Sequence, residues 1–354
     1  MQVFRPQSVV EQLAAHLREE IRSGRLEGGM PGVARLVREL GVGTKTVVAA
    51  LNILKREGLL EGQGERRQSR IAATEGVPQP VMRIAFLAYE AADLGTPYQL
   101  DLLHKLRAAG HEPAFVSRTQ ESLGRDLRRV SAYVEGIKAD AWVVVAGSLE
   151  ILRWFEARPV PAFALFGRRR ELNLAGGGPD KVPAMREAVG RLRALGHRRI
   201  VLLAREERRK PKPGALERAF LDELAAQGIT AGAYNLPDWE ESHEGLQRVL
   251  DSLFGYTPPT ALIFEEAPLL TATLQYCTMR GIRVPQDLSM VCCDFDPHFA
   301  WCQPAISHIQ WDPRPVVSRI VRWAGRVARG IDDRRHTETR ARFIEGGTIG
   351  PARK

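Results

Sequence analysis

Apolar residues recur at helical spacing three times within the first 57 positions, and each recurrence predicts a short amphipathic helix. The first helix begins near Ser8, which fits a capping box with Glu11. A second helix runs from about residue 33 to 40, and a third from Thr44 to about Glu57. Glycines at 62 and 64 then separate two short segments, which predicts a small two-stranded hairpin.

Three helices followed by a hairpin are the layout of a winged helix-turn-helix module that binds DNA. The third helix is the one expected to enter the major groove, with its first turn meeting base edges and phosphates. Arginines in the hairpin suit phosphates or a minor groove. The predicted DNA-binding residues are Arg35, Gly43, Thr44, Lys45, Thr46, Arg66 and Arg67. The alternative is a three-helix module for protein interaction, whose basic residues form only a solvated face.

This stretch resembles the GntR family of bacterial regulators over about residues 5–72. The resemblance rests on Arg22–Leu26 with Met30-Pro31, on Leu40–Val47, on Ala50-Leu51 and on Arg56–Leu59. It implies operator binding as a homodimer. The sequence departs from the family, which usually has Ser and Arg where Gly43 and Thr44 stand and Arg-Glu where Val48-Ala49 stand; Lys45 and Arg35 are expected to compensate.

The pattern changes after a Pro-containing linker at residues 73–81. Short apolar runs now alternate with helical stretches, which predicts two parallel sheets joined by right-handed crossovers. Ligands of such sheets bind at the carboxyl ends of the strands. The predicted strands are Arg83–Tyr89, Pro113–Ser117, Ala141–Ala146, Ala162–Phe166, Ile200–Ala204, Gly232–Asn235, Ala261–Phe264 and Ser289–Cys293. The three glycines at 176–178 are interpreted as a flexible loop.

Residues 82–350 resemble the effector-binding domain of the LacI/GalR repressors, a two-lobed α/β fold shared with periplasmic sugar-binding proteins. The resemblance rests on Leu195–Ile200, Gly281–Ser289 and Pro304–Ile309, with Asp238-Trp239 and Gly346–Thr348 in agreement. It implies a fold in which two lobes close on a small molecule, most often a sugar, and thereby change the affinity for DNA.

The resemblance also implies candidate effector-binding residues between the lobes. Asp294 follows the last predicted strand and is placed to accept hydroxyl hydrogen bonds, while Trp239 is placed to stack on a ring. The full set is Tyr89, Glu90, Tyr98, Arg168, Trp239, Glu265 and Asp294. Three departures from the family stand out: Leu216 replaces an Arg, Cys292 replaces a Gly, and the second-lobe Asp has no clear counterpart, although Asp180 is near.

Composition and charge narrow the function classes. The 354 residues carry 51 Lys and Arg against 42 Asp and Glu, a net charge of +9. Residues 1–74 hold 12 Lys and Arg against 8 Glu, so the positive charge per residue is highest where DNA is expected. No apolar run of about 18 residues and no secretory signal are present, and the four cysteines form no disulfide framework, which favours the cytoplasm.

The sequence gives little support for metal binding or for enzyme activity. Cys292 and Cys293 point to opposite faces of a strand and cannot easily bind one metal ion. Hydrolase, zinc-protease, P-loop and dinucleotide motifs are absent, so no enzyme activity and no cofactor is expected. The basic runs at 168–170 and 205–212 are interpreted as solvated loops, with the binding of an anionic ligand as the alternative.

The sequence therefore predicts a sequence-specific transcriptional regulator, a repressor that binds operator DNA as a homodimer and responds to a sugar. The alternatives are a solute-binding protein without a DNA function and an enzyme on an α/β scaffold.

Overall fold

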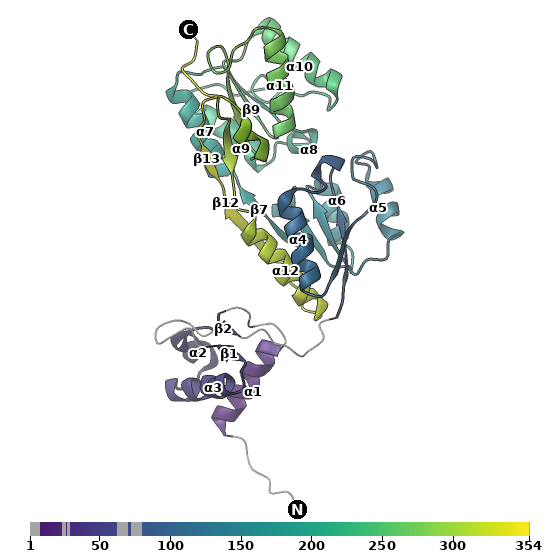
Figure 1. Cartoon of the computed structure of the whole chain (residues 1–354), viewed down its shortest axis with the longest axis vertical. Helices are drawn as coiled ribbons and strands as arrows, with labels where there is room; N and C mark the ends of the chain where they lie inside the picture. The colour runs from purple at the N-terminus through teal and green to yellow at the C-terminus, as the bar shows by residue number, and fades with distance from the viewer. Residues whose placement is uncertain (1–7, 23–25, 27–28, 62–69, 72–79, 354) are drawn as a thin grey trace, which may run out of the picture. The chain divides into compact units, whose positions relative to one another are not determined.

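The computed structural model describes residues 8–22, 26, 29–61, 70–71 and 80–353 (Figure 1). The chain divides into two compact units, one of residues 1–82 with 323–333 and one of residues 83–322 with 334–354. The predicted boundaries at 72 and 81 stay predictions, because most of the linker lies outside the described residues. No described helix is both long and apolar enough to cross a membrane.

The amino-terminal unit contains the three predicted helices and a short antiparallel strand pair. The predicted capping box is present, because the backbone N–H of Ser8 donates to Glu11 Oε2 at 2.8 Å and Glu11 N–H donates back to Ser8 Oγ at 3.3 Å. Gly41 ends the second helix with a φ of 66°, a conformation that favours glycine. The elements are α1 (Val9–Arg22), α2 (Val33–Leu40), α3 (Thr44–Arg56), β1 (Leu60–Glu61) and β2 (Arg70–Ile71).

The larger unit begins with a lobe built on a six-stranded sheet, which we call lobe 1. All its strand pairs are parallel, in the order β12-β7-β6-β5-β3-β4. The strands are β3 (Arg83–Leu87), β4 (Glu112–Phe115), β5 (Ala141–Val145), β6 (Ala162–Leu165), β7 (Ala175–Asp180) and β12 (His336–Arg340). The helices are α4 (Pro97–Ala108), α5 (Leu127–Glu135), α6 (Leu149–Glu156) and α12 (Arg314–Ala328), of which α12 belongs to the larger unit only up to Arg322, and short 3-10 turns lie at Ala91–Asp93 and Arg169–Glu171.

The second lobe, lobe 2, holds a five-stranded sheet in the order β13-β11-β10-β9-β8, in which only β13 is antiparallel to its neighbour. Its strands are β8 (Ile200–Leu203), β9 (Ala261–Phe264), β10 (Ser289–Cys292), β11 (Ser307–Gln310) and β13 (Arg342–Ile344). Its helices are α7 (Val182–Ala194), α8 (Glu206–Arg209), α9 (Ala215–Ala226), α10 (His243–Tyr256) and α11 (Ala267–Met279), with a 3-10 turn at Pro297–Trp301.

Both faces of the lobe 2 sheet are buried, as a parallel sheet requires. Alternate residues of each strand enter two separate apolar cores, so Cys292 packs in one core and Cys293 in the other. The expectation that the two thiols face opposite ways therefore agrees with the structure.

The chain passes between the lobes three times, from β7 into α7, from β11 into α12 and from β12 into β13 (Figure 1). A two-lobed α/β architecture follows a helical amino-terminal module along the chain, and this confirms the predicted fold class.

The interpretation of residues 176–178 as a loop is wrong, because they form the middle of β7, between β6 and β12. Glycine is needed there for close packing. A Cβ on Gly176 would lie 2.9 Å from Arg169 Cδ, and one on Gly177 would lie 3.1 Å from both Phe163 Cζ and Val316 Cγ1. Glycine and proline are rare in strands, which is why the pattern did not predict this one.

The predicted strand at residues 232–235 is also wrong, because this segment forms a turn at the edge of β8. Asn235 makes the hydrogen bonds to β8 that a neighbouring strand would otherwise make. Its side-chain amide donates to the carbonyl oxygen of Ile200 at 2.8 Å, and its carbonyl oxygen accepts from the N–H of Leu202 at 2.7 Å. The edge of the sheet is thus satisfied without another strand.

Candidate functional site

Helix α3 presents one apolar and one polar face. Val47, Ala50 and Leu54 are buried against α1 and α2, while Thr44 and Lys45 are exposed on the first turn. The far end of the helix is tied to α1, because the Arg18 guanidinium donates from Nε and Nη2 to the Glu57 carboxylate at 2.9 and 2.5 Å. The helix is therefore held firmly on one side and open on the other.

The predicted DNA-binding residues divide into those the structure describes and those it does not. Gly43 is the exposed N-cap residue before α3, Thr46 is half-buried, and Arg35 lies exposed on α2 with its Nε 2.7 Å from Glu39 Oε1. Arg66 and Arg67 fall outside the described residues. The direct DNA contacts of all these residues stay predictions.

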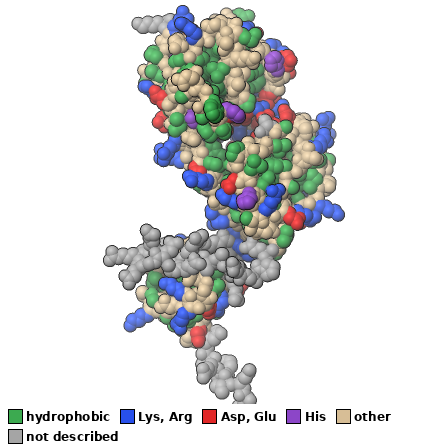
Figure 2. Space-filling model, in the orientation of Figure 1, with side chains coloured by type: hydrophobic (Ala, Val, Ile, Leu, Met, Phe, Trp, Pro, Cys, Tyr) green, Lys and Arg blue, Asp and Glu red, His purple; other side chains and the backbone are tan. Residues whose placement is uncertain are grey.

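The carboxyl ends of the strands from the two lobes meet, and two predicted effector residues lie at the junction. The Tyr89 hydroxyl, just beyond β3, donates to Glu207 Oε2 in lobe 2 at 2.8 Å. Glu90 Oε1 accepts from Arg205 Nη2 at 3.1 Å, and the same nitrogen donates to Glu266 Oε2 at 2.7 Å. Burial raises the pKa of Tyr89, and the negative charges of Glu207 and Glu241 raise it further. Acidic and basic side chains gather where the lobes meet (Figure 2).

A second set of contacts between the lobes lies beside the first. Arg125 of lobe 1 pairs with Glu241 of lobe 2, which is almost fully buried, and its Nη1 also donates to the Tyr89 hydroxyl at 2.9 Å. Arg125 and Tyr89 thus connect the lobes through one shared network.

Arg168 also crosses between the lobes, but it contacts backbone rather than carboxylates. Its guanidinium donates to the carbonyl oxygens of Glu207 at 2.7 Å, Arg208 at 2.9 Å, Lys210 at 3.0 Å and Lys212 at 2.6 Å. Burial lowers the pKa of this side chain. Arg168 therefore fixes the loop after β8.

Glu265 lies deep in lobe 2, at the end of β9. Its Oε1 accepts from Arg208 Nε at 2.8 Å and its Oε2 from the backbone N–H of Arg205 at 2.7 Å. Burial is the main cause that raises the pKa of Glu265 to about 8; Arg208 opposes it, and the nearby Glu266 and Glu217 add to it. Its carboxyl group therefore positions the loop after β8.

The more open part of the junction holds Asp294 and Tyr98. Lys181 Nζ, at the start of α7, lies 3.5 Å from Asp294 Oδ1, whose side chain is partly exposed. The Tyr98 ring packs edge-on against Phe166 and Trp311, with centroid distances of 6.0 and 6.1 Å. A carboxylate, an ammonium group and aromatic rings are the groups that hold a hydroxylated ring compound.

Trp239 lies elsewhere. It is buried in an apolar core of lobe 2, and its Nε1 donates to the carbonyl oxygen of Ala204 at 3.0 Å. The Arg209 guanidinium lies over the ring at 5.7 Å from its centroid and donates to the Trp239 carbonyl oxygen at 2.7 Å. The indole thus shapes the wall behind the junction, and ligand stacking by Trp239 stays a prediction.

Comparisons with known proteins identify both parts of the chain. Residues 9–67 match the model for bacterial regulatory proteins of the gntR family, and residues 189–349 match the model for the periplasmic binding protein-like domain. The HTH-type transcriptional regulator MalR of Streptomyces coelicolor is 24% identical over 312 residues, which cover 85% of this chain and 83% of MalR.

The chain is a transcriptional regulator. It joins a GntR-type DNA-binding domain to a periplasmic-binding-protein-like domain, as the sequence predicts. The relatives of this regulator are not enzymes, in agreement with the predicted lack of catalytic function.

Solved structures show the fold of the regulator more fully. A transcriptional regulator CelR–cellobiose complex has a TM-score of 0.61 at 16% identity, covering 90% of this chain and all of that one. A LacI-family regulator from Enterococcus faecium with bound ribose has a TM-score of 0.58 at 16% identity, covering 77% of this chain and all of that one.

The basic runs of the regulator are only partly solvated, which corrects the sequence interpretation, although the side chains of Arg170, Lys210 and Lys212 are exposed. Arg169 and Arg209 are buried, and the side chains of Arg205 and Arg208 are largely covered. Sequence analysis also missed Arg125, Lys181, Glu241 and Trp311. Sequence position could have indicated such residues. Trp311 directly follows β11, and Arg205 comes shortly after the end of β8, so both lie at the carboxyl edge of the sheet.

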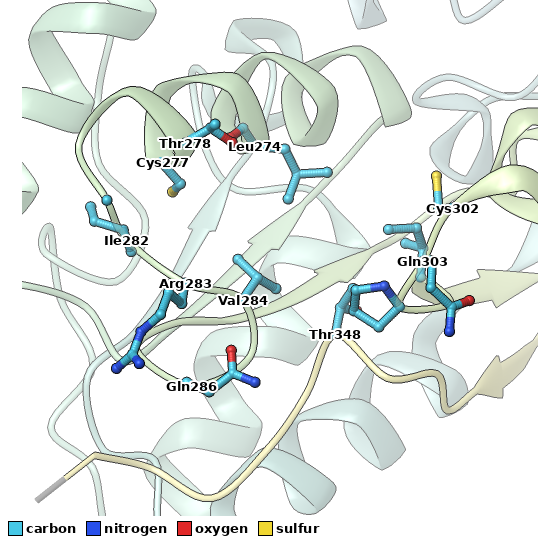
Figure 3. A pocket seen from close by; sticks show the side chains of 13 residues that line it. Leu274, Cys277, Thr278, Ile282, Arg283, Val284, Gln286, Cys302, Gln303 and Thr348 are labelled. Atoms are coloured by element: carbon cyan, nitrogen blue, oxygen red, sulfur yellow. The ribbon is translucent and has the colours of Figure 1, made fainter.

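A groove of about 700 Å³ lies on lobe 2, formed by residues other than those of the junction (Figure 3). Leu274 and Thr278 of α11 line one side, and Cys302 and Gln303 line another. Trp301, next to the groove in sequence, is 88% exposed, and Met279 is 78% exposed. This part of the regulator presents apolar surface to solvent.

Proposed function

We propose that this regulator is a cytoplasmic repressor that binds operator DNA as a homodimer and responds to a sugar held between lobes 1 and 2. The observation that carries the proposal is the meeting of the strand carboxyl ends, which brings carboxylates, cations and aromatic rings from both lobes together. The closing of two lobes on a ligand is a way to couple binding to a change of shape.

The choice of a sugar rests on chemistry and on relatives. Asp294 and Lys181 offer an acceptor and a donor for hydroxyl groups, and the Tyr98 and Trp311 rings offer apolar faces for C–H surfaces. Solved structures with a similar fold contain cellobiose, ribose and glucose.

The effector is tested by thermal shift across a sugar panel with the wild type and Asp294→Ala. We expect a stabilising sugar to lose its effect in Asp294→Ala and to keep it in Asp222→Ala, an exposed carboxylate on α9. Equal stabilisation of both variants would place the sugar away from Asp294.

Operator binding is tested by gel shift on promoter-proximal DNA with and without the stabilising sugar. We expect Lys45→Ala to weaken the shift, because Lys45 is exposed on the first turn of α3. A sugar that stabilises the protein but leaves the shift unchanged would contradict the regulatory coupling and leave DNA binding intact.

Dimer formation is supported by the exposed apolar surface around the groove on lobe 2. A two-fold dimer uses the same patch on both copies, and two recognition helices then match two half-sites. In sedimentation experiments we expect Trp301→Arg to produce monomers and Tyr256→Arg to leave dimers, although both side chains are 88% exposed. A dimeric Trp301→Arg would place the interface elsewhere.

A further inference from the structure

The exposed face of α3 carries a stripe of residues that the fold does not use. Lys45, Val48, Asn52 and Arg56 follow one another at spacings of three, four and four positions, which places them on one side of the helix. All four are exposed, and Val48 is 42% exposed. On the opposite side Val47, Ala50 and Leu54 are buried in the apolar core of the module, and Leu51 and Ile53 pack against that core.

Val48 and Asn52 cost helix stability where they stand. Valine loses side-chain freedom in a helix, and asparagine competes with the helical backbone for hydrogen bonds. Packing does not offset this loss of helix stability, because both side chains are exposed. Within the described part of the chain no hydrogen-bond partner faces the Asn52 amide. An exposed valine and a free amide in the middle of a recognition helix are therefore explained by what the helix binds.

The chemistry of these two side chains selects A·T base pairs. The asparagine amide can donate and accept at once, which matches N7 and the N6 amino group of adenine in the major groove. An apolar side chain makes favourable contact with the C5 methyl group of thymine, a group that no other base presents in the major groove. Lys45 and Arg56 at the two ends of the stripe suit guanine or phosphate oxygens.

The spacing fits neighbouring base pairs. A helix rises about 1.5 Å per residue, so Val48 and Asn52 lie about 6 Å apart along the axis. Base pairs follow one another at about 3.4 Å, so the two side chains reach bases within about two steps.

We propose that Asn52 reads an adenine and Val48 a thymine methyl group, so that each operator half-site contains two A·T pairs within about two base-pair steps. The inference rests on the DNA-binding role of α3 and adds to it the identity of the bases.

The test begins by selecting binding sites from random double-stranded DNA with the full-length wild type. Affinities are then measured by fluorescence anisotropy for the selected site and for two modified copies. One copy carries 7-deazaadenine, which lacks the N7 acceptor, and the other carries uracil for thymine, which lacks the methyl group. We expect the wild type to lose about tenfold in affinity with 7-deazaadenine and a smaller factor with uracil.

Each penalty should disappear only in its own variant. Asn52→Ala should bind the 7-deazaadenine site and the selected site equally, while still losing affinity with uracil. Val48→Ala should show the reverse. Lys55→Ala, which removes a neighbouring exposed cation, should weaken all three sites by the same factor and keep both penalties.

Two results would overturn the inference. One is a selected half-site that lacks two A·T pairs within about two base-pair steps of each other. The other is a 7-deazaadenine penalty that persists unchanged in Asn52→Ala. Since the affinity of the wild type is measured in every arm, loss of base reading is distinguishable from loss of DNA binding.

Discussion

The two binding regions of this regulator treat polar side chains in opposite ways. On α3, Lys45 and Asn52 point to solvent and lie apart from the apolar contacts that hold the helix. Between the lobes, Glu90 and Arg125 are already paired with Arg205 and Glu241 from the other side. The polar side chains of α3 are exposed to solvent, whereas those between the lobes already form ion pairs with one another.

This difference determines how each region can respond to its ligand. DNA can dock on α3 without disturbing the fold, because nothing internal is lost. A molecule entering between the lobes must replace existing ion pairs or use the less occupied part near Asp294. Its binding is therefore linked to how tightly the lobes hold each other, and a change of shape follows from differential affinity for the two arrangements.

The largest effect is expected from Arg208→Ala, which leaves the buried carboxyl of Glu265 without the donor to its Oε1. Leaving a buried polar group without its hydrogen-bond partner costs about 1–3 kcal/mol. We expect a clear fall in the denaturant midpoint, measured by urea unfolding. Lys55→Ala, an exposed cation on α3, should leave the midpoint unchanged. A small effect in Arg208→Ala would mean that the interior pairs contribute no more than surface charges do.

The stability of the regulator should also depend on pH through the buried carboxyl of Glu265. The pKa of Glu265 is raised from its ordinary value to about 8 by burial, so its contribution to stability is complete below about pH 4.5 and is lost as pH rises through about 8. Glu265→Gln cannot ionise. We expect its melting temperature to rise relative to the wild type between pH 6 and pH 8.5, and a constant difference would contradict the buried, hard-to-ionise state of this carboxyl.

The same contrast explains which features of the regulator could be predicted from its sequence. The amino-terminal module was predictable because its determinants are local: helix spacing, the Ser8 cap and the Gly41 turn all lie within a few residues of what they control. The predicted β3, β5 and β9 were also found, because each is a continuous apolar run.

The junction was less predictable because its partners are distant in the chain. Arg125 and Glu241 are 116 positions apart, and nothing near Arg125 indicates that it is covered. A run of arginines after β8 has the composition of a solvated loop, and only the opposing lobe makes it an interior feature. Gly177 likewise forms a strand because of Phe163 and Val316, which its own neighbours do not reveal.

A moderate effect is expected from Arg125→Ala, which breaks the Arg125–Glu241 pair between the lobes. We expect a stability loss of about 1–2 kcal/mol, because Arg125 is partly exposed and solvent replaces some of the lost contact. Hydrogen exchange should also rise around Tyr89 and around Glu207, since both belong to the same network.

The matched control for this variant is Glu135→Ala, which breaks an exposed ion pair with Arg158 inside lobe 1 and leaves Arg158 over the Trp154 ring. We expect almost no loss of stability and no change of exchange at the junction. Equal behaviour of the two variants would show that the pair between the lobes does not hold them together.

The smallest effect on the fold is expected from Arg35→Ala on α2. The Arg35–Glu39 pair is exposed and lies one helical turn apart, so its loss should change stability by no more than about 0.5 kcal/mol. DNA affinity should nevertheless fall several-fold, with a salt dependence reduced by about one phosphate contact. Glu39→Ala removes the same ion pair while keeping the cation, and therefore should not weaken DNA binding. If both variants lose affinity equally, the ion pair positions α2 and Arg35 does not itself meet DNA.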